Sequence, residues 1–244
     1  VRDYGARLSS IDGGSLRNAI PREAFAIITI PGDNVEALWE LVSDYQEMYR
    51  SEYKGIEHNI NFTAEMTDMP ATLIPEEIQD DLINAIEGCQ NGVISMLVDF
   101  PGTVESSTNL AIVKSSNEMI EIQILVRSSS ESRKEAVCSS LESIFSLAGA
   151  KVEYSDGYGG WQPNIDSPIL KIMQQAYLDL YGKKPEAKVM HAGLECGIIQ
   201  ESYPDMDMIS IGPDLQHPHS PDERVSIPSV ARTWDFIVTT LARI

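Results

Sequence analysis

The densest group of metal-binding and acid–base side chains lies in the segment SIGPDLQHPHSPDERV, residues 210–225. It places His217 and His219 close to two carboxylates, Asp222 and Glu223. Neutral imidazole is a good ligand for Zn²⁺ or Mn²⁺, and a carboxylate can orient it through the other ring nitrogen. The His-Pro-His spacing is not that of paired ligands on a helix, so we expect at most one of the two histidines to bind a metal. A solvated polar loop is the alternative interpretation.

A second candidate is the segment HAGLECGI, residues 191–198, in which two glycines flank an acidic residue and a thiol. Gly193 lacks a Cβ atom and can therefore let backbone N–H groups approach a substrate oxygen. Cys196 with His191 or His217 would make a thiol nucleophile and its base, although nothing local marks an activated thiolate. A tight strand-to-helix turn with a buried Cys196 is the structural alternative.

Two further polar residues occupy places where a side chain can meet a ligand. Asn18, in the turn RNAIP, offers both a donor and an acceptor, although asparagine is common in turns. Arg127 ends a predicted strand on the face opposite its apolar residues, where the guanidinium can grip a carboxylate through two hydrogen bonds. On strand logic alone, a surface salt bridge is the simpler explanation of Arg127.

The elements that must position these residues follow from hydrophobic periodicity and from turn and capping residues. Strands are predicted over 6–12, 24–30, 57–65, 93–98, 105–113, 119–127, 151–155, near 187–190 and near 207–211. Helices are predicted over 75–87 and 131–148, and from Asp33 or Asn34, from Ser167 and Pro168, and from Pro228. The order strand, strand, helix, strand occurs over 6–65 and again over 105–155, a weak internal repeat that predicts an antiparallel sheet with helices on one face.

The glycine-rich segment DGYGGWQPN, residues 156–164, is the predicted domain boundary. We expect an α+β domain with a weak internal duplication over 1–158. Residues 159–244 are expected to be part of an α/β domain, because ~85 residues are few for a doubly wound domain.

Composition excludes several classes of protein. The chain has 244 residues, 43% of them apolar, and a net charge of −19, which argues against nucleic acid or an anionic membrane as partner. Its three cysteines are odd in number and widely spaced, as expected of reduced thiols in a cytoplasmic protein. The motifs GxSxG, HExxH, GxxxxGK[ST] and CxxC are absent, which removes the commonest serine hydrolases, zincins, P-loop NTPases and zinc ribbons.

Four parts of the sequence together resemble one family in order and spacing. They are GGSLRNAIPREAF, ESSTNLAIV followed by QILVRSS, HAGLECGI, and MDMISIGPDLQHPHSPDERV. They resemble the C-terminal half of the aminoacyl-histidine dipeptidases, the Xaa-His dipeptidases also called peptidase D or bacterial carnosinase, of the M20 metallopeptidase family. The resemblance covers essentially the whole chain. It implies a lid domain over 1–158 and the last segment of a zinc-peptidase catalytic domain over 159–244.

The resemblance also implies a chemistry and a set of site residues. Family members hydrolyse the peptide bond with a metal-activated water between two divalent ions, zinc in the first instance, with manganese or cobalt as alternatives. His219 matches the family's last metal ligand. Asn18 matches a residue that hydrogen-bonds the tetrahedral oxyanion, Arg127 one that holds the C-terminal carboxylate of the substrate, and Gly193 one in the loop that lines the pocket.

The family's other metal ligands and its general-base glutamate are not present in this sequence. One histidine cannot hold two metal ions, which need several ligands each. We therefore expect a piece of a longer cytoplasmic enzyme, inactive by itself, with a dipeptide as its substrate and a possible homodimer through the lid. Two alternatives remain open, a non-catalytic lid or dimerisation module and an unrelated thiol enzyme that uses Cys196.

Overall fold

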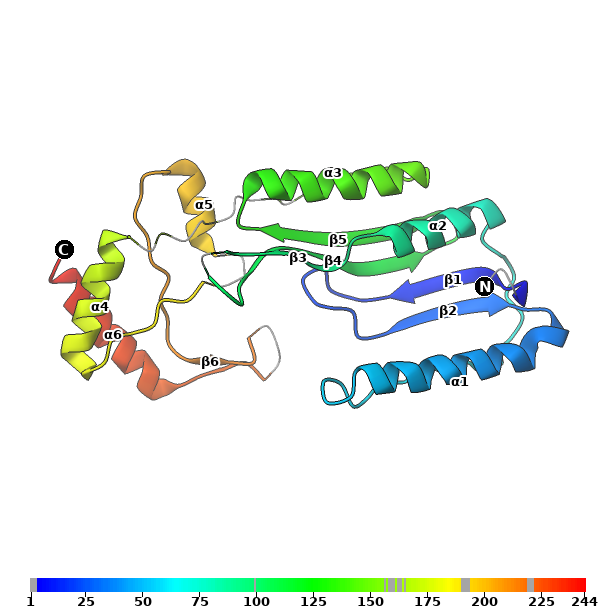
Figure 1. The fold of residues 1–244 in the computed structure, drawn as a ribbon, viewed down its shortest axis with the longest axis horizontal. Helices are drawn as coiled ribbons and strands as arrows, with labels where there is room; N and C mark the ends of the chain where they lie inside the picture. The colour runs from blue at the N-terminus through cyan, green and yellow to red at the C-terminus, as the bar shows by residue number, and fades with distance from the viewer. Residues whose placement is uncertain are drawn as a thin grey trace. The chain divides into compact units, whose positions relative to one another are not determined.

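The computed structural model describes residues 4–98, 100–155, 157, 161, 164, 166–189, 194–218 and 222–244, and Figure 1 shows its elements. The strands are β1 (Arg7–Gly13), β2 (Ala24–Thr29), β3 (Gly92–Met96), β4 (Val104–Ser115), β5 (Ile120–Ser128), β6 (Leu215–Gln216) and β7 (Arg224–Val225). The helices are the 3-10 turn η2 (Gly32–Asn34), α1 (Val35–Glu52), α2 (Glu76–Gly88), α3 (Glu131–Leu147), α4 (Pro168–Tyr181), α5 (Glu195–Ser202) and α6 (Ile227–Leu241). No helix in this described part is long and apolar enough to cross a membrane.

Close approach between Cα atoms groups the chain into two compact units. The first comprises Val1–Gly92, Thr108–Leu125 and Ser139–Val152, and the second Val93–Ser107, Val126–Cys138 and Glu153–Ile244. The division passes through β3, β4, β5 and α3, so it does not follow the ends of the elements. The boundary between 1–158 and 159–244 stays a prediction.

Strand β4 is the central member of a five-stranded sheet. The strand order is β2-β1-β4-β3, and β5 also pairs with β4. Strands β1 and β2 pair antiparallel with a register shift between Leu8 and Ser10. Strands β1 and β4 are also antiparallel and meet through Asp12 opposite Lys114 and Gly13 opposite Val113. An antiparallel sheet accompanied by helices was predicted and is confirmed, whereas the lid assignment and the duplication stay predictions.

Polar side chains hydrogen-bond the backbone beyond the end of the short β1–β4 ladder. Ser115 Oγ accepts the backbone N–H of Ile11 at 2.8 Å and donates to the carbonyl of the same residue at 3.1 Å. Farther along β4, the side-chain oxygen of Asn91 accepts the N–H of Leu110 at 2.8 Å. Unpaired backbone groups cost free energy on folding. The Ser115 and Asn91 side chains supply the hydrogen bonds that a neighbouring strand would otherwise make with Ile11 and Leu110.

Helix α2 and the segment just before it bind backbone groups of Leu8 in β1. The Gln79 side chain is 2% exposed, and its Oε1 accepts the N–H of Leu8 at 2.6 Å. The carbonyl of Leu8 accepts the N–H of Ile74 at 2.8 Å, just before α2 begins. Both backbone groups of a residue at the register shift of β1 are therefore satisfied by the α2 segment.

The strand predicted over 57–65 is wrong. This segment lies along α1, where Phe62 packs edge-on against Tyr45 and Tyr49 with ring centroids 6.3 and 5.9 Å apart. The Gln46 side chain accepts the N–H of Phe62 at 3.1 Å. A side chain of α1 therefore accepts a backbone N–H that a neighbouring strand would otherwise accept. The alternating apolar pattern of 57–65 reflects contact with a helix and not with a sheet.

The strand predicted over 151–155 is wrong for a related reason. The segment follows α3, and the Tyr154 hydroxyl donates to the carbonyl of Cys138 in that helix at 3.2 Å. The strand, strand, helix order is present in β1-β2-α1 and in β4-β5-α3, but in neither place does the described chain add the predicted fourth strand.

Two short predicted strands of the C-terminal region are also absent from the described residues. Residues 207–211 are not a strand, and the Asp207 carboxylate instead accepts the N–H of Ile169 at the start of α4, at 2.8 Å. Residues 187–189 are not a strand, and residue 190 lies outside the described part. A strand exists only with a partner for its hydrogen bonds, and an apolar run alone does not supply one.

Helices α4 and α6 form a small core of their own. Met173 and Ala176 of α4 pack with Phe236 of α6. Tyr177 meets the Phe236 ring edge-on with centroids 5.2 Å apart. The predicted start of α4 is confirmed, since Ser167 Oγ accepts the N–H of Leu170 at 3.1 Å and so caps the helix.

Gly14 fixes the path of the chain where it leaves β1. Its φ is +72°, and a Cβ atom added to it would lie 1.8 Å from the carbonyl oxygen of Ala111 in β4. Its N–H donates to the carbonyl of Glu23 at 3.1 Å. The obstructing atom belongs to the backbone of the central strand, so a rotamer change cannot relieve the clash.

We expect Gly14→Ala to destabilise the protein by about 3 kcal/mol or more, whereas Gly149→Ala should cost only the ~1–2 kcal/mol of a left-handed alanine. Gly149 has a φ of +74° with no atom within 4 Å of the added Cβ, and it is therefore a matched control. Urea denaturation of both variants in the complete protein measures the difference. Equal losses would show that the contact with Ala111 is unimportant.

Candidate functional site

Asn18 lies on an exposed turn that follows Gly14. The turn is closed by a hydrogen bond from the N–H of Ala19 to the carbonyl of Leu16, at 3.1 Å. Asn18 is the third residue of this four-residue turn and is exposed. A carboxamide in this position can donate a hydrogen bond to an oxygen atom outside the protein.

Arg127 is the penultimate residue of β5 and is half-buried. Side chains alternate along a strand, so Arg127 shares its face with Glu121 and Gln123, as predicted. Gln123 donates to the Glu121 carboxylate at 2.7 Å. The guanidinium of Arg127 is planar and always charged, which suits it to a carboxylate that has a fixed orientation.

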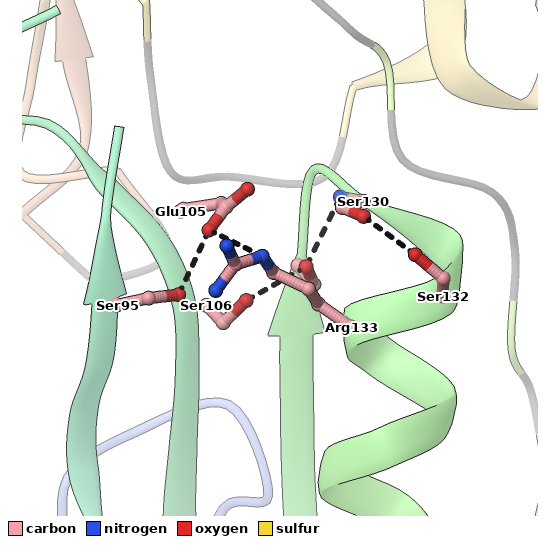
Figure 2. Close-up of polar contacts among 7 residues, drawn as sticks. Ser95, Glu105, Ser106, Ser130, Ser132 and Arg133 are labelled. Atoms are coloured by element: carbon pink, nitrogen blue, oxygen red, sulfur yellow. Dashed lines mark hydrogen bonds and ion pairs between the residues drawn. The ribbon is translucent and has the colours of Figure 1, made fainter. Parts of the chain in front are cut away.

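A network of polar side chains holds the end of the strand that carries Arg127. Figure 2 shows Glu105 of β4 between Ser95 of β3 and Arg133 of α3. The Glu105 carboxylate accepts the Ser95 hydroxyl at 2.9 Å and meets Arg133 Nε at 3.1 Å. The Glu105 side chain is 15% exposed, so these partners offset much of the cost of burying its charge.

The same network bonds the strand end to the start of α3. The hydroxyls of Ser106 and Ser128 are 2.8 Å apart, and Ser128 Oγ also accepts the N–H of Ser130 at 3.0 Å. The N–H of Ser129 donates to the carbonyl of Glu105 at 3.0 Å. These bonds join the two hydroxyls to each other and to backbone groups, so the arrangement positions the end of the strand.

Sequence reasoning missed this network. Glu105 begins the segment ESSTNLAIV, but its partner Arg133 is distant in the chain and lies outside the segments that resemble the family. The run of serines after Arg127 was the available signal, because serine favours the turns and helix starts where such networks form.

The histidine-containing loop lies between β6 and β7. His217 has a φ of 52°, a left-handed conformation that is uncommon outside glycine. The hairpin is joined to α6, since Ser229 Oγ accepts the N–H of Asp214 at 2.9 Å and Arg232 meets the Asp214 carboxylate at 3.0 Å. His219, the predicted metal ligand, lies outside the described residues.

The segment around Gly193 and Cys196 is described only in part. Gly193 lies outside the described residues, and Cys196 is the second residue of α5. Burial raises the pKa of the Cys196 thiol above its ordinary value, and the neighbouring Glu195 carboxylate raises it further. A nucleophilic cysteine needs a lowered pKa, so this environment opposes the thiol-enzyme interpretation.

The two predicted site residues that the structure describes belong to different compact units. Asn18 belongs to the first compact unit and Arg127 to the second. Among the residues that the structure describes, no group of three or more His, Cys, Asp and Glu side chains could hold a metal ion. That part of the chain therefore holds no complete metal centre.

Comparison with known proteins gives a consistent result. The profile of peptidase family M20/M25/M40 matches residues 17–243. The chain is 40% identical over all 244 residues to the cytosol non-specific dipeptidase of Escherichia coli (strain K12), of which it spans 50%. The crystal structure of aminoacylhistidine dipeptidase from Vibrio alginolyticus matches with a TM-score of 0.89 and 40% identity, over 100% of this chain and 50% of that one.

A more distant structure shows likeness of fold alone. The aminopeptidase PepT from Bacillus cereus matches with a TM-score of 0.55 and 16% identity, over 66% of this chain and 44% of that one. The chain spans about half the length of the curated relative it matches.

We expect alkylation of Cys196 to show an unactivated thiol. Because the pKa is raised, the thiolate forms only at higher pH, and the pH midpoint of iodoacetamide alkylation should lie above that of N-acetylcysteine amide, which has no free carboxylate. Glu195→Gln removes the nearby negative charge and should lower that midpoint. Site-resolved mass spectrometry over a pH series makes the measurement, and a midpoint below the reference would revive the thiol mechanism.

Proposed function

The chain belongs to peptidase family M20/M25/M40, and we propose that it forms half of a metal-dependent dipeptidase that hydrolyses Xaa-His dipeptides. The observation that supports the proposal best is 40% identity over the entire chain to a protein named as a dipeptidase. A solved relative of the same identity is named an aminoacylhistidine dipeptidase. The two names differ in substrate breadth, so preference for a C-terminal histidine is the finer part of the proposal.

In this proposal the chain corresponds to the C-terminal half of its relatives. Residues 1–158 form the lid, through which two copies associate, and 159–244 complete the catalytic domain. We assign the complete enzyme to the cytoplasm.

Two divalent ions, zinc or alternatively manganese or cobalt, belong to the proposal for the complete enzyme. The described residues do not fit a metal by themselves, since they hold no cluster of three candidate ligands. His219 remains the proposed ligand from this chain, with the other ligands and the general-base glutamate outside it.

The two described site residues bind opposite features of a dipeptide. The Asn18 amide donates to the carbonyl oxygen of the scissile bond as that oxygen gains negative charge, and so stabilises the transition state. Arg127 binds the free carboxylate, which distinguishes a dipeptide from an internal segment of a protein. Gly193 is proposed to line the same pocket.

We expect Arg127→Lys in the complete enzyme to lower kcat/KM for free-acid dipeptides by about 5- to 100-fold, and Arg127→Ala by more, because lysine keeps the charge but loses the two-pronged geometry. The loss should largely vanish for amide-capped dipeptides, which have no carboxylate. Both variants are assayed on both substrates, with metal content and thermal unfolding as controls.

The substrate comparison decides what Arg127 does. An equal loss on capped and uncapped substrates would assign Arg127 a structural role or a role at the oxyanion. Unchanged activity would support the alternative interpretation, in which Arg127 forms a salt bridge at the protein surface.

We expect the isolated 244-residue chain to bind Zn²⁺ weakly and to hydrolyse no dipeptide, since a catalytic zinc site needs about three protein ligands. Isothermal titration with Zn²⁺ and a sensitive assay for released histidine test this. Turnover that persists unchanged after contaminating peptidases are removed would contradict the expectation. The non-catalytic alternative requires that the complete protein also be inactive.

A further inference from the structure

A second asparagine holds the turn on which Asn18 lies. Asn109 of β4 donates through Nδ2 to the carbonyl of Ala19 at 2.8 Å and to the carbonyl of Arg17 at 3.3 Å. These are the residues directly before and after Asn18. One carboxamide thus bonds to both sides of the proposed oxyanion donor.

The position of Asn109 follows from the path of the chain beside β4. The last ladder pair is Gly13 opposite Val113, and the next residue, Gly14, lies against the carbonyl of Ala111. The connection therefore continues back along β4 toward Asn109. The β1–β4 ladder has ended there, and the Asn109 side chain spans the distance between β4 and the turn.

These contacts fix the backbone on both sides of the Asn18 Cα atom. The bond to the Arg17 carbonyl holds the peptide plane before Asn18, and the bond from the Ala19 N–H to Leu16 holds the plane after it. With both planes held, the direction in which the Asn18 side chain leaves the backbone is fixed. Donors to an oxyanion are effective only when they are held in place before the reaction.

We propose that Asn109 is a positioning residue for catalysis, which orients Asn18 toward the oxyanion without touching substrate. The inference rests on the proposed function, in which Asn18 stabilises the transition state. Asn109 then contributes to kcat through the turn and leaves binding of the ground-state substrate nearly unchanged.

The test uses Asn109→Asp and Asn109→Ala in the complete enzyme. Aspartate keeps the size of the side chain but replaces the donating amide with a carboxylate that repels both carbonyls. A displacement of about 1 Å can cost up to ~100-fold in rate, so we expect kcat to fall about 10- to 100-fold with KM within about twofold. The substrate is a free-acid Xaa-His dipeptide.

Asn91→Ala is the matched control, because the Asn91 side chain bonds the N–H of Leu110 in β4, whereas the Asn109 side chain bonds the turn. It should lower the thermal midpoint and leave kcat within about twofold. An equal fall in kcat for Asn91→Ala would overturn the inference, since general loosening of β4 would then explain both variants.

Asn18→Ala separates failure of the inference from failure of the proposed function. If Asn18→Ala lowers kcat and Asn109→Ala does not, the positioning role of Asn109 is wrong while the role of Asn18 stands. If Asn18→Ala leaves kcat unchanged, the proposed role of Asn18 is wrong, and the inference is lost with it. The double variant should lose no more than Asn18→Ala alone, because Asn109 acts only through Asn18.

Discussion

The junction between β1 and β4 constrains the rest of the sheet. It has a short backbone ladder, Asp12 with Lys114 and Gly13 with Val113, and it joins the β1–β2 hairpin to the strand that also pairs with β3 and β5. Ser115 continues the junction by bonding both backbone groups of Ile11. A ladder this short fixes register only if the chain beyond it is also constrained. Gly14 provides that constraint, since no side chain fits between it and β4.

This constraint explains why the turn after β1 is suited to a functional residue. The turn is exposed, as functional loops usually are, yet Asn109 bonds its backbone at two carbonyls to β4, the strand with the most partners in the sheet. An exposed donor on a rigid support meets the requirement for stabilising a charge that exists only in the transition state. The position of Asn18 therefore agrees with the role proposed for it.

Arg127 is supported in a different way. The nearly buried carboxylate of Glu105 in β4 bonds Ser95 of β3 and Arg133 of α3. The carbonyl of Glu105 accepts the N–H of Ser129, two residues after Arg127. Partial burial keeps the ion pair with Arg133 from being fully screened by solvent. Hydroxyl and backbone hydrogen bonds hold the end of the strand, so a guanidinium there can present its N–H groups in one orientation.

The sequence by itself determined the family and the long helices, because motifs such as SIGPDLQHPHSPDERV and apolar residues at helical spacing are local signals. It also placed β1, β2, β4 and β5 close to their observed bounds. Tertiary structure decided what the segment 57–65 packs against, and it assigned Asn109 to the turn around Asn18. An alternating apolar pattern is the same whether its partner is a strand or a helix, and a hydrogen bond between residues about 90 positions apart has no local signature. Those features depend on which surfaces folding brings together, and only the assembled chain supplies them.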